Sequence, residues 1–75
     1  MKIGVIGAGG WGTAISTVLA DNGHEVCIWA FEKELANEIN ENRSNSMYLP
    51  SARIPEGVCA ANDIIKLYDI DVIFL

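Results

Sequence analysis

The residues with the clearest chemical meaning are the glycines that follow the first apolar segment. Gly7, Gly9 and Gly12 occupy the glycine positions of the pattern G-x-G-x-x-G in the sequence GAGGWG. In this pattern the first glycine allows a tight turn, the second lets the backbone touch a pyrophosphate, and the third lets the following helix lie close to a sheet. A helix beginning near Gly10 directs its free N–H groups and positive dipole end toward the phosphates. The motif predicts dinucleotide binding, and the alternative is a structural turn of another α/β fold.

A carboxylate and an aromatic ring come next, just past a second apolar segment. Glu32 lies about 20 residues after the glycine turn, where a carboxylate accepts hydrogen bonds from the adenosine ribose of a bound dinucleotide. Alternatively, Glu32 is an exposed acid in the first turn of a helix, where the helix dipole favours it. Phe31 either covers one face of the adenine ring or packs in the core at the start of that helix. The sequence leaves both alternatives open for each residue.

These residues must be positioned by strands and helices that alternate along the chain. Short apolar or β-branched segments predict four strands: Lys2 to Ile6, Glu25 to Trp29, Gly57 to Ala60 and Asp71 to Leu75. The first is expected to be buried on both faces, and the last is also expected to be buried. Helical periodicity and capping residues predict three helices: Trp11 to Asn22, Glu32 to Asn42, and a brief one from Asn62 or Asp63 through Tyr68. The segment from Arg43 to Glu56 contains both prolines and is predicted to be a long loop.

The order β-α-β-α-β-α-β predicts an α/β fold with a parallel sheet, right-handed crossovers and the strand order 3-2-1-4. This is the N-terminal half of a Rossmann-type doubly wound sheet. In the first helix, apolar residues at positions 11, 14, 15, 18 and 19 predict the buried face, and Gly23 is expected to cap its end. The sequence ends in a strand. We therefore expect residues 1–75 to be the N-terminal part of an NAD-binding domain, with the rest of that domain and a catalytic domain outside this chain.

Composition and charge narrow the classes of partner. The chain has 75 residues, a net charge of −5 and no cluster of Lys and Arg, which argues against nucleic acid or an anionic membrane as partner. Its apolar runs are far shorter than the roughly 20 residues of a membrane-spanning helix. The N-terminus reads as a buried strand rather than a signal peptide, so we expect a cytoplasmic protein. Cys27 and Cys59 lack CxxC spacing and are expected to be buried, reduced thiols.

The sequence shows neither a nucleophile–base pair nor a cluster of metal ligands, so we expect no catalytic residue and no metal site in this chain. His24 follows a glycine at a turn and has no carboxylate arranged beside it as a partner. The basic residues outside the motif are each expected to be solvated surface charges: Lys33, Arg43, Arg53 and Lys66.

Three segments together resemble a known enzyme family: GAGGWGTA, EVCIWAFE, and the sequence NSMYLP from Asn45 to Pro50. They are similar to NAD(P)-dependent sn-glycerol-3-phosphate dehydrogenase, a family that reduces dihydroxyacetone phosphate to sn-glycerol 3-phosphate. The resemblance covers essentially the whole chain, and the N-x-x-Y-L-P segment is its most specific part. It implies that the catalytic lysines and the groups that grip the substrate phosphate lie beyond residue 75. The parent enzyme is then a cytoplasmic oxidoreductase with a small-molecule substrate, and the resemblance allows a homodimer.

The resemblance implies cofactor contacts in the glycine turn and beyond the second strand, at Gly7, Gly9, Gly10, Trp11, Gly12, Phe31 and Glu32. For Trp11, hydrophobic packing at the start of the helix is as open an interpretation as a cofactor contact. For Tyr48 a cofactor contact is also open, but a loop anchor in the domain core is favoured. Asn45 and Pro50 are expected to shape the loop.

One departure from the family pattern bears on the cofactor. Many bacterial members carry a basic residue or a histidine where Phe31 stands, often beside another base, and these suit a 2′-phosphate. The pair Phe31-Glu32 is closer to members that look specific for NAD, so NAD is favoured and NADP is the alternative. Two other functions stay open: a non-enzymatic NAD-sensing module, and another dehydrogenase such as a ketopantoate or pyrroline carboxylate reductase type. The N-x-x-Y-L-P loop favours the glycerol-3-phosphate enzyme over the sensor.

Overall fold

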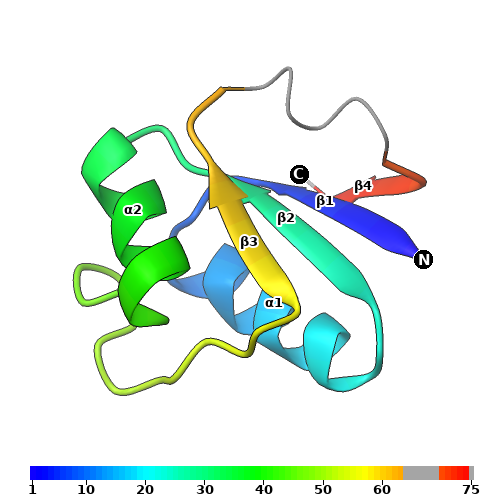
Figure 1. The fold of residues 1–75 in the computed structure, drawn as a ribbon, viewed down its shortest axis with the longest axis horizontal. Coiled ribbons are helices and arrows are strands. Elements are labelled where there is room, and N and C mark those ends of the chain that lie inside the picture. The colour runs from blue at the N-terminus through cyan, green and yellow to red at the C-terminus, as the bar shows by residue number, and fades with distance from the viewer. Residues whose placement is uncertain (64–69, 75) are drawn as a thin grey trace.

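The computed structural model describes residues 1–63 and 70–74 of the chain (Figure 1). Within them, one sheet is accompanied by two helices, in the order β1 (Lys2–Ile6), α1 (Gly10–Asp21), β2 (Glu25–Trp29), α2 (Lys33–Asn42), β3 (Val58–Ala61) and β4 (Val72–Phe74). Every strand pair is parallel, and the strand order is β3-β2-β1-β4. The predicted fold class and strand order are confirmed. The brief helix predicted between residues 62 and 68 falls largely outside the described residues.

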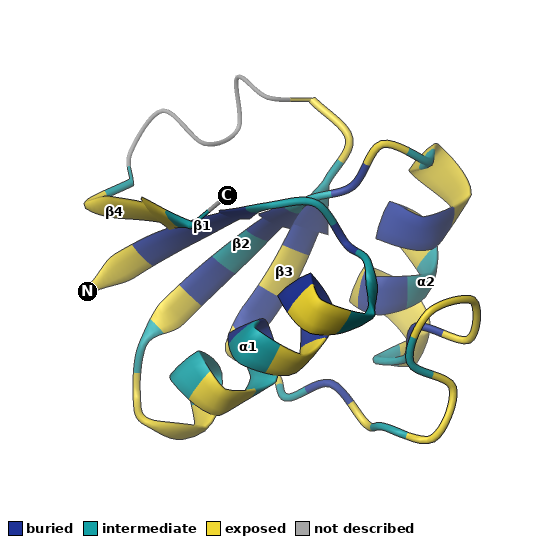
Figure 2. Ribbon diagram, turned by 180° about the vertical axis from the view of Figure 1, so that it is seen from behind, coloured by how far each residue is buried: buried dark blue, intermediate teal, exposed yellow. Residues whose placement is uncertain are grey.

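The core lies between the sheet and the two helices. The connections from β1 to β2 and from β2 to β3 run in the same direction, and right-handed crossovers place both helices on one face. Alternate residues of β2 and β3 point to that face and are buried, as the dark blue bands of Figure 2 show: Val26, Ile28, Val58 and Ala60. They pack with Leu35, Ala36 and Ile39 of α2 and with Ile54 from the following loop. The predicted apolar face of α2 is confirmed.

The buried face of α1 differs from the prediction. Trp11 and Val18 are 66% and 53% exposed, whereas Gly12, Thr13 and Ser16 are buried. The reason is the close approach of α1 to the turn after β1: a Cβ on Gly12 would lie 2.3 Å from the carbonyl oxygen of Gly7. Only small residues fit such a contact. Ser16 satisfies its buried hydroxyl by donating to the Gly12 carbonyl at 2.7 Å, within the helix itself.

The end of α1 is capped as predicted. Gly23 adopts a positive φ of 92°, which a glycine adopts without steric cost. Its N–H donates to the Ala20 carbonyl, and the N–H of His24 donates to the Leu19 carbonyl, which is the hydrogen-bond pattern of a Schellman motif. The helix begins and ends one residue earlier than the sequence predicted.

The second helix ends at Arg43, whose role the sequence prediction missed. Arg43 has a left-handed backbone with φ 54°, and its side chain is only 13% exposed, so it is not a solvated surface charge. Its guanidinium donates to the carbonyls of Pro55 and Val58, and its own carbonyl accepts from the Ile54 N–H at 2.8 Å. Arg43 therefore joins the two ends of the long loop. Arg53, by contrast, is exposed as predicted.

The start of the loop is held to α2 by a carboxylate. Glu38 accepts hydrogen bonds from the Ser44 hydroxyl at 2.8 Å and from the Ser46 N–H at 2.9 Å. These two bonds, the Ser44 bond first, lower the pKa of Glu38 below its ordinary value. The loop is therefore fixed at both ends by α2 and its C-cap.

The last two strands show where burial was overpredicted. β3 begins and ends one residue later than predicted, and β4 is shorter than the predicted segment. The segment was predicted to be a buried strand, but Val72 and Ile73 of β4 are 38% and 54% exposed (Figure 2). It pairs with β1 at the edge of the described sheet, and its Phe74 packs against the core. Neither α1 nor α2 has the length and apolarity needed to span a lipid bilayer.

The two cysteines lie on the sheet face opposite the core. Cys27 is half-buried and Cys59 is exposed, so the expectation of two buried thiols is wrong for Cys59. Their neighbours Val26 and Val58 point to the helices, and side-chain alternation turns the cysteines to the opposite face of the sheet. Both cysteines are free, as predicted.

Candidate dinucleotide-binding site

The glycine turn stands at the carboxyl end of β1. Gly7 has a φ of 110°, a conformation that L side chains rarely adopt. Its N–H donates to the Trp29 carbonyl at 2.9 Å, which ties the turn to the end of β2. The positive φ therefore lets the chain leave the central strand and enter α1 within a few residues.

Gly9 forms the open part of the turn. It is the N-cap residue of α1, and a Cβ placed on it would meet no atom within 4 Å. The first N–H groups of a helix have no intrahelical acceptor, and Gly9 has no side chain to satisfy them. The positive end of the α1 dipole therefore begins beside an open position at Gly9, the arrangement that the glycine motif predicts for a pyrophosphate site.

Gly10 and Gly12 have the opposite surroundings. A Cβ on Gly10 would lie 2.9 Å from the backbone oxygen of Tyr48, and a Cβ on Gly12 would overlap the Gly7 carbonyl. These glycines allow two backbone segments to approach, whereas Gly9 leaves room for a ligand. The contact at Gly10 also brings the N-x-x-Y-L-P loop directly against the turn.

Asn45 anchors that loop in the protein interior. It is fully buried, and its side-chain amide donates to the Ala8 carbonyl at 2.9 Å and to the Thr13 hydroxyl at 2.8 Å. Its side-chain oxygen accepts from the Tyr48 N–H at 3.1 Å. Asn45 shapes the loop as expected. The sequence did not indicate that the loop is fastened to the glycine turn and to α1.

Tyr48 and Glu32 meet across the rim of the site. The Tyr48 hydroxyl donates to the Glu32 carboxylate at 3.1 Å, and this hydrogen bond together with the carboxylate charge raises the pKa of Tyr48. Tyr48 is 43% exposed, so the favoured prediction of a core anchor is wrong; Asn45 performs that function. Glu32 is the N-cap residue of α2 and stands three positions after Trp29, the last residue of β2. The hydrogen bond from Tyr48, a residue of the loop, therefore holds the Glu32 carboxylate in place at the start of α2.

Phe31 and Trp11 both have exposed rings. They are 77% and 66% exposed, which rules out the core-packing alternative for each. The Phe31 ring meets Trp29 edge-on, with centroids 6.2 Å apart and planes at 65°. Large apolar rings left in water at the rim of a predicted nucleotide site are available to cover a base or a ribose.

Asn62 is a supporting residue that sequence reasoning assigned to another role. It was a candidate helix cap, but its side-chain amide donates to the Phe31 carbonyl at 2.8 Å and to the Ala30 carbonyl at 3.1 Å. Its own carbonyl accepts from the Trp29 indole at 3.0 Å. Asn62 thus fixes the segment that carries Phe31 and Glu32. A polar residue directly after a strand was the only sequence signal for it.

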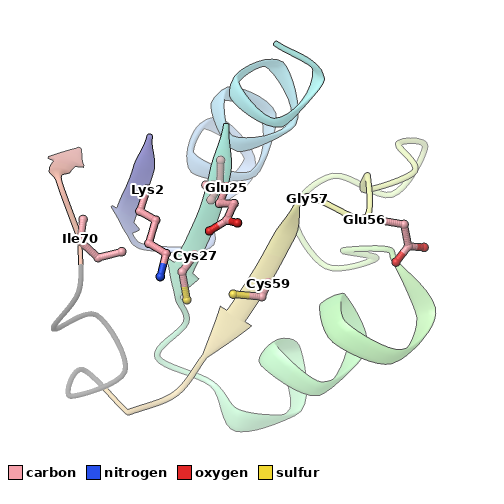
Figure 3. Close-up of a pocket in the computed structure, with 8 residues that line it drawn as sticks. Lys2, Glu25, Cys27, Glu56, Gly57, Cys59 and Ile70 are labelled. Atoms are coloured by element: carbon pink, nitrogen blue, oxygen red, sulfur yellow. The ribbon is translucent and has the colours of Figure 1, made fainter. Parts of the chain in front are cut away.

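The predicted site residues gather at the carboxyl ends of β1 and β2, together with Tyr48 from the loop. In doubly wound sheets ligands bind at this edge, beside the point where the strand order reverses. A cavity of about 450 Å³ lies elsewhere, lined by Lys2, Glu25 and Gly57 near the starts of strands and by Cys27 and Cys59 within them (Figure 3). Among residues 1–63 and 70–74, no three His, Cys, Asp or Glu side chains cluster as metal ligands.

Comparison with known proteins agrees with this geometry. A sequence profile of the family described as NAD-dependent glycerol-3-phosphate dehydrogenase N-terminus matches residues 2–75. Relatives named glycerol-3-phosphate dehydrogenase (NAD(P)+) are 49% identical over 74 residues in Halalkalibacterium halodurans and 51% identical over 75 residues in Bacillus mycoides. Each match covers 99% of this chain but only 21% and 22% of the relative. The chain therefore spans about a fifth of the length of these relatives.

Solved structures show the same arrangement. Glycerol-3-phosphate dehydrogenase from Coxiella burnetii matches with a TM-score of 0.87 and 36% identity, over 96% of this chain and 22% of that one. The enzyme from Saccharomyces cerevisiae matches with a TM-score of 0.88 and 36% identity, over 97% and 25%. The resemblance carried by the glycine turn and the N-x-x-Y-L-P loop is confirmed. This chain belongs to the NAD-dependent glycerol-3-phosphate dehydrogenase N-terminus family.

Proposed function

We propose that this chain holds the adenosine and pyrophosphate part of NAD in an oxidoreductase that interconverts dihydroxyacetone phosphate and sn-glycerol 3-phosphate. It is the N-terminal part of the cofactor domain, and the reacting groups lie on other parts of the enzyme. The observation that carries the proposal is the open space at Gly9, the N-cap residue of α1, where an added Cβ would meet no atom within 4 Å. The names of the relatives support the substrate pair.

The described residues fit such a cofactor. Gly7, Gly9 and the first amides of α1 would bind the pyrophosphate, with Trp11 and Gly12 completing the turn. Glu32 would accept hydrogen bonds from the ribose hydroxyls, and the exposed ring of Phe31 would cover the adenine. Tyr48 would act beside them, because its hydroxyl already contacts Glu32. The nicotinamide supplies the hydride when the cofactor is bound.

NAD is the favoured cofactor and NADP the alternative, on the evidence of Glu32. Its carboxylate suits two free ribose hydroxyls and repels a 2′-phosphate, and the neighbouring Phe31 supplies no positive charge to offset that repulsion. We also infer a cytoplasmic enzyme that binds no nucleic acid, which the net charge of −5 supports. A homodimeric parent stays a prediction that sedimentation of the complete enzyme will test.

The test is a chimera in which residues 1–75 replace the matching segment of the Halalkalibacterium halodurans relative, which is 49% identical. We expect oxidation of NADH that depends on dihydroxyacetone phosphate, at a rate within about tenfold of the unaltered relative. The unaltered relative and a chimera carrying Gly9→Val are the controls. A folded chimera that does not bind NADH would contradict the proposal.

A further inference from the structure

The two cysteines form a pair that the dinucleotide site does not use. Cys27 of β2 and Cys59 of β3 are direct partners in the parallel register. Neighbouring strands lie about 4.8 Å apart, which is within the Cα separation of about 4.4–6.8 Å that a disulfide needs. Both side chains leave the same face of the sheet, and Figure 3 shows both sulfur atoms directed into one cavity. The pairing arises from strand register, and the 31 residues between the two positions in the sequence conceal it.

The cavity gives a small oxidant access to the pair. It has a volume of about 450 Å³ and is also lined by Lys2, Glu25 and Ile70. A water molecule occupies about 30 Å³ in the liquid, so a hydroperoxide of two oxygen atoms fits easily. These lining residues begin or precede strands, whereas the glycine turn follows the carboxyl end of β1. The cavity is therefore separate from the proposed cofactor site.

The two thiols are chemically unequal. Cys59 is exposed, and its pKa is lowered to about 7, first by a hydrogen bond from Cys27 and also by the Arg43 charge. Cys27 is half-buried, and its pKa is raised by the same hydrogen bond and by burial. Because the thiolate is the nucleophile, this arrangement favours attack by Cys59 while Cys27 keeps its proton. Glu25 opposes part of the shift, and Lys2 and Glu56 are the other charges that line the cavity.

We propose that Cys27 and Cys59 are a peroxide-sensitive dithiol, in which Cys59 is the attacking and Cys27 the resolving residue. The Cys59 thiolate attacks one oxygen of a hydroperoxide, the O–O bond breaks, and the protonated leaving oxygen departs as water or an alcohol. The resulting sulfenic acid is attacked by Cys27; an S–S bond forms, the S–O bond breaks, and the hydroxyl leaves as water with the Cys27 proton. Two thiols are oxidised and one peroxide is reduced. A dithiol reductant restores the thiols.

The proposal goes beyond cofactor binding and stands independently of it. In the strand register Cys27 lies opposite Gly4 of β1, before the glycine turn begins at Gly7, and Cys59 lies opposite Cys27. Val26 and Ile28, the neighbours of Cys27, remain packed on the core side when the opposite face is bridged. Oxidation is therefore expected to leave the affinity for NADH unchanged within about twofold, which separates a failure of this proposal from a failure of the proposed function.

The experiment measures disulfide formation in the reduced 75-residue chain after addition of hydrogen peroxide at neutral pH. Mass spectrometry follows the loss of two hydrogen atoms within one chain, and the same reaction is run in concentrated urea. We expect oxidation at least about tenfold faster without urea. In the folded chain adjacent strands hold the two thiols side by side, whereas in urea the flexible chain between them must first close into a loop. Equal rates of disulfide formation with and without urea would overturn the proposal. This holds also if the rates are equal because the chain does not fold in the absence of urea.

Single substitutions test the two roles. Cys27→Ser is expected to accumulate a sulfenic acid at Cys59 that a 1,3-dione traps, because no resolving thiol remains. Cys59→Ser removes the attacking thiol, so its reaction with peroxide is expected to be at least about tenfold slower than that of Cys27→Ser. The two variants are matched controls, since each retains one thiol and differs by one atom at the other position. Equal peroxide reactivity of the two variants, or disulfides formed between chains, would also overturn the proposal.

Discussion

At the scale of single residues, the glycines of one short motif have different functions. A Cβ on Gly9 would enter open space, whereas a Cβ on Gly12 would lie 2.3 Å from the Gly7 carbonyl oxygen. The sequence pattern gives all of them the same letter. Their surroundings distinguish Gly9, which leaves room for the proposed ligand, from Gly12, which lets α1 pack against the turn.

Replacing Gly12 by alanine is therefore expected to destabilise the fold. The new methyl group meets backbone atoms of Gly7, which cannot rotate away, so α1 must shift. Such overpacking costs roughly 1–3 kcal/mol in the free energy of unfolding. Urea denaturation of Gly12→Ala, with Gly9→Ala as the matched control, measures the effect. Equal midpoints for the two variants would show that α1 accommodates the methyl group.

Glu32 is expected to determine the choice between NAD and NADP. A 2′-phosphate brings close to two negative charges beside the carboxylate, and solvent and salt at the open rim weaken the repulsion. We expect a preference for NADH of about ten- to thirtyfold. The measurement is kcat/KM with both reduced cofactors in the chimera, before and after Glu32→Arg. Equal use of both cofactors by the wild-type chimera, or no gain in activity with NADPH after Glu32→Arg, would show that Glu32 does not determine cofactor choice.

At the scale of elements, the long loop is as important as the helices, because it completes the site. Arg43 joins its ends, Glu38 holds its start, and Asn45 fastens its middle to Ala8 and Thr13. The Tyr48 hydroxyl then reaches Glu32, which stands at the end of β2. The loop therefore links the turn after β1 with the turn after β2.

Asn45→Ala is expected to lower stability and loosen the site together. It leaves the buried Ala8 carbonyl and Thr13 hydroxyl without their amide donor, which costs about 1–3 kcal/mol. NADH affinity should fall as well, because the loop no longer rests on Gly10. Asn37→Ala, on the exposed face of α2, is the control and should leave both unchanged. An Asn45→Ala variant as stable as that control would show that the network is dispensable.

At the scale of the whole molecule, the sequence was sufficient for the architecture but not for the contacts that finish the site. Alternating strand and helix patterns predict the sheet order because connection rules leave few choices. Trp11 and Phe31 were open to core packing because residue type favours burial, whereas the structure leaves both rings exposed. The hydrogen bonds of Asn45 and Asn62 join residues more than thirty positions apart. Such pairs depend on the assembled register, which no local pattern contains.

The exposed edge of the sheet at β4 is expected to make the chain associate. Val72 and Ile73 of β4 are exposed apolar residues on an edge strand, and such edges pair with other chains. Sedimentation equilibrium over a wide concentration range should show reversible association of the 75-residue chain. Ile73→Lys should reduce it, because a charge on the edge opposes strand addition. A monomer at every concentration would show that β4 is protected.

The most direct test of the account is to locate NADH on this chain by backbone amide NMR. The account predicts the largest shift changes in the glycine turn, residues 7–12, and around Glu32, with little change at Cys27 and Cys59. It further predicts that Gly9→Val binds NADH at least tenfold more weakly, about 1.4 kcal/mol, with an unchanged thermal midpoint, since the side chain enters only the ligand's space. Shift changes concentrated at the cysteine cavity, or unaltered affinity in a folded Gly9→Val variant, would contradict the account.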